Sequence, residues 1–428
     1  MENTMKNGKA TILVVGEVSA EDTISTGGAL RSTRAIKEYA RHFDVHLLMP
    51  PHLKVDPAYV KNSLGVKDTI QCALFPRALF SEGRFSFTYV MIPPRALRLL
   101  MKNPRRLSVD PDAIVVLNET YDCLSIGRVL KEEHGTPSLA MLQLPVLYHD
   151  KRRREQIVKA FELWYQELYA DGKLVGLIGK LRTRIELLVA WSRLMKNLLN
   201  SYDMLLAVSK AIVHEMGEEY SSRFYVLDPG VSLNPQDVEL IQTIRKHSKE
   251  RRDHVVFGGR VDALKGFIEG LYVFKEIVKT YSSLKLIATG YVGEKLRLRV
   301  EKLVRRLGLE DKVVLTGVVP RAERFKLIAE AKLVLYPSHV DSFSYSVLES
   351  LMLGTPVVAY DIPALRLYYG STRGVHLVRE GDVEALSKET IDVLSSRTEE
   401  VEPPKLRSWN DILEEEVSVI KNLATRTR

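Results

Sequence analysis

The segment from Leu333 to Tyr360 constrains the fold more than any other part of the chain. Leu333–Tyr336 and Val357–Tyr360 are two short apolar runs, and a helical pattern between them ends at Gly354. A glycine at that place tolerates the positive φ at which helices commonly end. The segment therefore predicts a strand, loop, helix and strand. Because ligands bind at the carboxyl ends of strands in open α/β sheets, the loop after Tyr336 is the first candidate site.

Two carboxylates flank the start of the predicted helix. Asp341 lies in the loop and Glu349 lies eight residues later. Free backbone N–H groups at a helix N-terminus suit phosphate or sugar oxygens, and carboxylates can hold sugar hydroxyls. For either acid alone, helix capping by Asp341 and a solvated face for Glu349 would be the simpler interpretation.

The pattern as a whole resembles the nucleotide-sugar loop of retaining family 4 glycosyltransferases. That loop runs Pro-Ser, Glu-Gly-Phe-Gly, Glu-Ala and Gly-x-Pro-Val-Val. This chain has Pro337-Ser338, Asp341 to Ser344, Glu349-Ser350 and Gly354 to Val358, so the first Glu is an Asp and both loop glycines are serines. The resemblance implies that Asp341 holds the sugar hydroxyls and Glu349 the ribose. It also implies that the donor lies along the residues between them, which are Ser342, Phe343, Ser344 and Tyr345.

Length and composition set the broad class. A chain of 428 residues is long enough for two α/β domains. Two cysteines without a CxxC motif, no His cluster at metal-ligand spacing and a polar N-terminus predict a cytoplasmic protein without disulfides. No apolar run reaches the ~18 residues of a membrane span. The net charge of +8 comes without a nucleic-acid motif, so we expect no nucleic-acid partner.

The first predicted strand is Thr11–Gly16, and Gly27-Gly28 precede a helix from Ala29 to about Arg41. Glycines at a helix start let the backbone approach a ligand closely, although a lone Gly-Gly is usually a turn. The resemblance implies that Gly27 and Gly28 face the donor phosphates.

Further strands are predicted at 45–49, 112–117, 138–142 and 204–208. The strand at 204–208 is taken as the last one of the first domain, and residues 50–110 are predicted to be irregular.

Asp110-Pro111-Asp112 precedes its strand, so a structural turn is favoured over a metal-binding DxD motif. We expect no metal.

Two residues are candidates for the acceptor side. Gln143 stands where the resembling family often has a histidine near the reacting sugar, and His149 follows six residues later. Gln143 can form hydrogen bonds but cannot carry a proton. A loop histidine such as His149 is more often structural.

Residues 151–200 form a basic segment with eleven Lys/Arg against five Asp/Glu. Apolar residues recur at helical spacing from Leu174 to Leu198, while Arg182, Arg184, Arg193 and Lys196 lie largely on another face. Either the stripe packs on the core, or the helix binds an anionic membrane surface.

The second domain opens with the strand His254–Phe257, followed by Gly259, Arg260, Lys265 and Gly266. A forked guanidinium and an ammonium after a strand suit two phosphates. The resembling family has a Gly-Arg…Lys-Gly motif here, which implies that both cations bind the donor phosphates. We expect both side chains at the surface.

Strands at 284–288 and 313–315 alternate with helices, giving a doubly wound sheet. Gly290 and Gly317 end two of these strands, where a base and ribose would lie. The stretch Trp409–Leu423 is amphipathic and, by the resemblance, crosses back to the first domain.

The resemblance implies an α/β GT-B fold, with two Rossmann-like domains facing across a cleft. The predicted domains are 1–232, a linker at 233–252, 253–405 and the helical segment 406–428. The expected activity is retaining transfer of a hexose from a nucleotide diphosphate sugar to a glycan or lipid-linked acceptor. No cofactor beyond this co-substrate is expected. The expected location is the cytoplasm or the cytoplasmic face of the membrane. Three alternatives stay open: a nucleotide-sugar epimerase, a glycan synthase or phosphorylase variant that uses soluble sugars, and a non-enzymatic sugar-binding protein.

Overall fold

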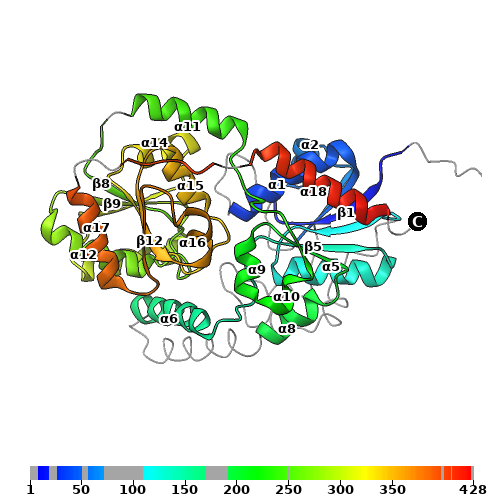
Figure 1. Ribbon diagram of the computed structural model, residues 1–428, viewed down its shortest axis with the longest axis horizontal. Helices are drawn as coiled ribbons and strands as arrows, with labels where there is room; N and C mark the ends of the chain where they lie inside the picture. The colour runs from blue at the N-terminus through cyan, green and yellow to red at the C-terminus, as the bar shows by residue number, and fades with distance from the viewer. Residues whose placement is uncertain are drawn as a thin grey trace, which may run out of the picture.

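The computed structural model describes residues 8–18, 27–50, 56–71, 109–169, 191–248, 250–396, 400–405 and 407–425. Within these residues the chain forms two all-parallel sheets, each covered by helices, which lie side by side (Figure 1). Parallel strands covered on both faces must be apolar throughout, and this is why the strands appear as continuous hydrophobic runs. The α/β class with two Rossmann-like domains is confirmed.

The first sheet has the order β3-β2-β1-β4-β5-β6-β7 within the described residues. Its strands are Thr11–Val15 (β1), Asp44–Met49 (β2), Asp68–Gln71 (β3), Ala113–Val116 (β4), Ser138–Leu142 (β5), Met204–Ala207 (β6) and Phe224–Val226 (β7). Its helices are Gly27–His42 (α1), Pro57–Leu64 (α2), Tyr121–His134 (α5), Lys151–Leu168 (α6), Trp191–Leu199 (α8), Lys210–Met216 (α9) and Glu218–Ser221 (α10).

Two sequence predictions in this domain are wrong. The strand at Met204 is not the last one, because β7 pairs with β6 beyond it. The region 50–110 also contains α2 and β3, which pairs with β2. Both strands lie at sheet edges and are short, so neither carries the continuous apolar run that identifies a central strand. The rest of that region lies outside the described residues.

The second sheet has the order β10-β9-β8-β11-β12-β13. Its strands are His254–Phe257 (β8), Lys285–Thr289 (β9), Val313–Gly317 (β10), Val334–Tyr336 (β11), Val357–Asp361 (β12) and Val375–Arg379 (β13). Its helices are Phe267–Thr280 (α12), Glu294–Arg306 (α13), Arg321–Ala329 (α14), Tyr345–Met352 (α15), Pro363–Tyr369 (α16) and Val383–Ser395 (α17), with Pro235–His247 (α11) before them. Helix α11 packs on α14 and α15.

Helix α6 follows a strand of the first sheet but packs on α12 and α13 of the second domain (Figure 1). Arg299 Nη1 of α13 donates to Leu168 O at 3.0 Å. Arg153 Nη2 donates both to Glu215 Oε1 of α9 at 2.8 Å and to His339 O at 2.6 Å. The basic helix thus ties the first domain to the second.

The apolar stripe proposed for a membrane surface lies mainly outside the described residues, including Arg182 and Arg184. Where it is described, in α8, Met195 and Leu198 are fully buried, and Lys196 pairs with Glu219 at 3.3 Å. This end of the stripe packs on α5 of the core. No described helix is long and apolar enough to span a membrane.

Helix α18 (Trp409–Ala424) runs from the second domain back to the first, where it contacts α1, β4 and β5. Its Glu416 is fully buried and accepts a hydrogen bond from Arg31 Nη2 of α1 at 2.5 Å. Tyr39 donates to the other carboxylate oxygen. A buried charge is tolerated only when it is paired and hydrogen-bonded, so these contacts fix α18 in place.

Candidate functional site

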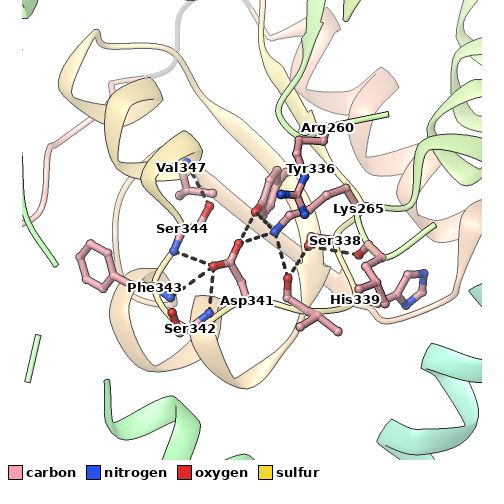
Figure 2. A network of polar contacts seen from close by, with 12 residues as sticks. Arg260, Lys265, Tyr336, Ser338, His339, Asp341, Ser342, Phe343, Ser344 and Val347 are labelled. Carbon is pink, nitrogen blue, oxygen red and sulfur yellow. Dashed lines mark hydrogen bonds and ion pairs between the residues drawn. The ribbon is translucent and has the colours of Figure 1, made fainter. Parts of the chain in front are cut away.

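The loop between β11 and α15 is shaped by Asp341 (Figure 2). Its Oδ1 accepts the backbone N–H groups of Ser342 at 2.8 Å, Phe343 at 3.4 Å and Ser344 at 3.1 Å. An Asp carboxylate that binds the following N–H groups holds the chain in a tight turn. The first carboxylate of the motif therefore orders the helix start.

The other oxygen of Asp341 belongs to a buried ion pair. Lys265 Nζ donates to Asp341 Oδ2 at 2.9 Å, to Val340 O at 3.0 Å and to Tyr336 Oη at 3.1 Å, and Tyr336 Oη donates to Asp341 Oδ2 (Figure 2). These acceptors match the three hydrogens of an ammonium group. The expectation of a surface Lys265 is wrong, because its side chain is only 16% exposed.

Burial and pairing act in opposite directions on the two charges. Burial acts to lower the pKa of Lys265, but the charge of Asp341 raises it overall. Burial likewise acts to raise the pKa of Asp341, yet Lys265 and the Tyr336 hydroxyl lower it overall. Both groups are therefore charged at neutral pH. The same surroundings raise the pKa of Tyr336 to about 12.

Glycines explain how Lys265 reaches the loop. Gly266 has φ 66° at the N-cap of α12, and a Cβ there would lie 2.0 Å from Pro337 O. A Cβ on Gly259 would lie 2.7 Å from Lys265 Cβ. Arg260 between them has a half-exposed side chain and donates from Nε to Asp262 Oδ2 at 3.0 Å. Arg260 is thus at the surface, as expected, and has most of its donors available.

Glu349 is held by arginines that the sequence analysis missed. Its side chain is 2% exposed and accepts from Arg321 Nη2 at 3.2 Å and from Arg324 Nη2. Arg321 Nε also lies 2.6 Å from Asp237 Oδ1 of α11. The sequence signal was present, since two arginines three residues apart at a helix start share one face.

The two domains meet at this loop. A Cβ on Gly27 would lie 3.2 Å from Tyr345 Cδ2, so the first glycine of α1 lies against the start of α15. Ser209 Oγ donates to Ser342 O at 2.6 Å. The structure thereby brings the Gly-Gly start of α1 and the Asp341 loop together, although they are more than 300 residues apart in sequence.

The acceptor-side candidates are both occupied by structural contacts. Gln143 Nε2 donates to Ser32 Oγ at 2.9 Å and to Leu117 O at 2.7 Å. A Cβ on Gly28 would lie 3.2 Å from Gln143 Oε1, so Gln143 borders the Gly-Gly start. His149 contacts Glu215 O through both its backbone N and its Nδ1, at 2.8 and 3.1 Å. It therefore fixes the start of α6.

Glu119, a residue that the sequence analysis did not select, lies at the carboxyl end of β4. One of its oxygens accepts the backbone N–H of Gln143 at 2.8 Å. Burial, opposed by these backbone contacts, raises its pKa to about 7. A carboxyl group that titrates near neutral pH suits proton transfer or the binding of a hydroxyl. The polar pair Asn118-Glu119 directly after a buried strand was the available signal.

At the far edge of the second sheet, Gly290 and Gly317 end β9 and β10 with positive φ values of 122° and 71°. Gly290 N donates to Gly317 O at 2.8 Å, which joins the two strand ends. The neighbouring Tyr291 is 74% exposed. An exposed aromatic ring beside such an edge offers a stacking surface for a flat ligand. No group of three or more metal-ligating side chains occurs in the described part of the chain.

Part of the chain is similar in sequence to known glycosyl transferases. Residues 241–408 match the family model described as glycosyl transferases group 1. Over 149 residues the chain is 29% identical to the 2-deoxystreptamine N-acetyl-D-glucosaminyltransferase of Streptomyces fradiae, covering 35% of this chain and 32% of the relative. Over 113 residues it is 33% identical to the D-inositol 3-phosphate glycosyltransferase of Segniliparus rotundus, covering 26% and 25%. The matched segments thus span a third or less of these relatives.

Solved structures are similar along the whole chain. The sucrose-phosphate synthase of Thermosynechococcus elongatus covers 97% of both chains with a TM-score of 0.63 at 16% identity. Anabaena HepE, solved in complex with UDP and glucose, covers 96% of this chain and 100% of its own with a TM-score of 0.58 at 15% identity. The chain therefore has the GT-B fold, and its second domain is similar in sequence to the group 1 glycosyl transferases.

Proposed function

We propose that the protein is a retaining glycosyltransferase that moves a hexose from a nucleoside diphosphate sugar to an acceptor hydroxyl. One observation carries the proposal. The part of the chain that matches glycosyl transferases group 1 contains the Lys265–Asp341 ion pair and the start of α15, at the carboxyl edge of its sheet. Backbone N–H groups and two cations at such an edge suit a diphosphate.

In this reaction the bond between the anomeric carbon and the donor phosphate breaks. The electron pair leaves with the nucleoside diphosphate, the acceptor oxygen bonds to the same face of the sugar, and the proton of the acceptor hydroxyl passes to the leaving phosphate. Arg260 and the first turn of α15 stabilise the charge that develops on the leaving phosphate. Lys265 acts mainly through Asp341, because its ammonium group already donates to that carboxylate. A phosphate oxygen near Lys265 would have to share one of the hydrogens already donated.

Asp341 and Glu349 divide the remaining work. Asp341 keeps the loop in shape. Because its two oxygens already accept five hydrogen bonds, a sugar hydroxyl that binds Asp341 would take the place of one of these donors. Glu349 faces the ribose, with Arg321 and Arg324 fixing its carboxylate. Leaving-group stabilisation by these side chains requires no metal, and transfer should therefore continue in excess chelator. Loss of activity that Mg²⁺ or Mn²⁺ restores would contradict this part of the proposal.

The first experiment is a screen of nucleoside diphosphate sugars for hydrolysis and for transfer to cyclitols, amino-cyclitols and glycans. Arg260→Gln should lower the rate roughly ten- to a hundredfold, because it removes a charge-assisted contact. The matched control is Arg366→Gln, which removes a similarly exposed arginine that pairs with Asp361 at 2.8 Å. Equal rates in the parent and Arg260→Gln would remove Arg260 from the site.

The acceptor is proposed to be a glycan or a lipid-linked sugar at the cytoplasmic membrane surface. The support is the surplus of basic residues in 151–200, since each basic side chain near an anionic surface contributes ~1 kcal/mol. Vesicle flotation tests this proposal. The protein should rise with anionic liposomes at low salt and remain behind with neutral ones, and absence of flotation would favour a freely diffusing acceptor.

A further inference from the structure

A group of arginines surrounds the junction of α1, α11, α14 and α15 beyond the Asp341 loop. Arg34 of α1 donates from Nη2 to Asp237 Oδ2 of α11 at 2.9 Å, and its side chain is 9% exposed. Arg321 of α14 donates to the same oxygen at 2.8 Å. Together with Arg324, three cations share the two carboxylates of Asp237 and Glu349. This leaves an excess of positive charge at the junction.

Three buried polar groups at this junction, two on Arg34 and one on Tyr345, have unused hydrogen-bonding capacity. Among the described residues, Arg34 Nε and Nη1 and the hydroxyl of Tyr345 have no hydrogen-bond partner. A buried donor has lost its contact with water, so native structures normally give it a hydrogen-bond partner. The three groups are therefore the ones that a ligand would satisfy.

Tyr345 lies one turn before Glu349 on α15, and Arg34 lies two turns after Gly27 on α1, so the Tyr345 hydroxyl and the arginines belong to the same junction between the domains. Burial raises the pKa of Tyr345, while the charges of Arg34, Arg31 and Arg321 lower it, in that order of strength. The ring of Tyr345 lies against Gly27, at the first residue of α1. Arg31 is neutralised by Glu416, whereas Arg34 keeps two buried donors without a partner.

We propose that Arg34 and the Tyr345 hydroxyl form an anion subsite between the two domains, which takes a phosphoryl group. Guanidinium and hydroxyl donors without acceptors, with a net positive charge, match the acceptor-only oxygens of a phosphate. The group comes either from the donor's diphosphate or from a phosphorylated acceptor or free phosphate. Only the assignment of the phosphoryl group to a sugar donor or to an acceptor rests on the proposed function. The subsite itself is tested with inorganic phosphate.

The test is calorimetric titration with potassium phosphate at constant ionic strength. Tyr345→Phe removes only a hydroxyl that has no partner in the described structure, so the fold should be unaffected while phosphate affinity falls several-fold. Arg34→Gln should lower the affinity roughly ten- to a hundredfold, because a charge-assisted contact is lost. Arg34→Lys should recover part of it. The matched control on the same helix is Arg41→Gln, whose side chain is 69% exposed and pairs with Glu38.

Equal phosphate affinity in the parent, Tyr345→Phe and Arg34→Gln would overturn the inference, as would the absence of phosphate binding to the parent protein. Titration with UDP, GDP and ADP then identifies the source. If phosphate competes with the nucleotide, the group is the donor's; if phosphate still binds to nucleotide-saturated protein, it belongs to the acceptor or to a free anion.

The same titrations separate this inference from the proposed function. If phosphate binding depends on Arg34 but the protein transfers no sugar, the subsite is supported and the proposed transferase activity is contradicted. If the protein transfers sugar but its phosphate affinity is unchanged in the Arg34 and Tyr345 variants, the transferase activity is supported and the subsite is contradicted.

Discussion

The carboxyl edges of the two sheets are built in different ways. In the second domain, Asp341 pairs with Lys265 and Glu349 pairs with Arg321 and Arg324. In the first domain, Glu119 accepts hydrogen bonds from backbone N–H groups and pairs with no cation among the described residues. The pKa of Glu119 is about 7. The difference indicates that the edge of the second sheet, where we propose that the donor binds, is pre-organised by paired charges, whereas the edge of the first sheet has a carboxyl group able to change its protonation.

The largest effect expected from this comparison is on stability. Asp341→Ala leaves the Lys265 ammonium buried without its partner and frees three backbone N–H groups, which should lower the free energy of unfolding by ~3–5 kcal/mol. Urea denaturation measures this loss. Lys265→Met combined with Asp341→Ala should be less destabilised than the sum of the single variants. The exposed pair Arg373–Glu400 is the control, where the corresponding losses should stay within ~1 kcal/mol. Purely additive losses at Lys265 and Asp341 would show that the pair is not coupled.

The next effect is on nucleotide binding. Glu349→Ala removes the carboxylate that is proposed to hold the ribose and leaves Arg321 and Arg324 with one partner fewer. Affinity for a nucleoside diphosphate, measured by calorimetry, should fall roughly ten- to a hundredfold. Glu389→Ala, at a partly exposed residue of α17 that contacts His376, is the control. Unchanged nucleotide affinity in Glu349→Ala would refute the ribose assignment.

An effect that depends on pH is expected from Glu119. Its pKa is about 7 in the folded protein and 4.5 without burial, so the folded state binds more protons than the unfolded state between these values. Stability should therefore decrease as pH rises from about 4.5 to about 7, and the loss should persist above that range. Glu119→Gln should remove this decline, so that the variant's stability relative to the parent is ~3 kcal/mol higher at pH 8 than at pH 4.5.

Chemical denaturation of Glu119→Gln and the parent across this pH range provides the measurement. Parallel pH profiles for the two proteins would show that Glu119 titrates normally and that the two sheet edges are electrostatically alike.

The smallest effect concerns Ser344, where the Asp341 loop has a serine in place of the glycine of the resembling motif. Ser344 has φ 67°, the only non-glycine residue with positive φ in the described chain. An L side chain in that conformation costs roughly 1–2 kcal/mol. Ser344→Gly should raise the free energy of unfolding by ~1 kcal/mol, reduced by the loss of the Ser344 Oγ contact to Val347 N. Ser346→Gly, inside the helix, should instead destabilise the protein.

The sequence predicted the central strands well, because β5 and β8 are short apolar runs bounded by turn residues and their limits match the structure. It missed β3 and β7, whose edge positions leave them little apolar signal. At the site, the spacing from Pro337 to Glu349 located the loop, and Gly27 was placed beside it by resemblance. The contacts of Lys265 and of Arg321 could not be predicted, because they join residues between 28 and 84 positions apart, and local patterns do not contain how such residues pack.

Helices α6 and α18 are exchanged between the domains, and this has a consequence for cutting the chain. A fragment ending near residue 232 would keep α6 without the α12–α13 surface that covers it, and would leave Arg31 buried without Glu416. The complementary fragment would lose Arg153 as the partner of Glu380. Each half thus contains a helix that packs on the other half. Separately expressed halves should be poorly soluble, whereas co-expression should recover a folded complex.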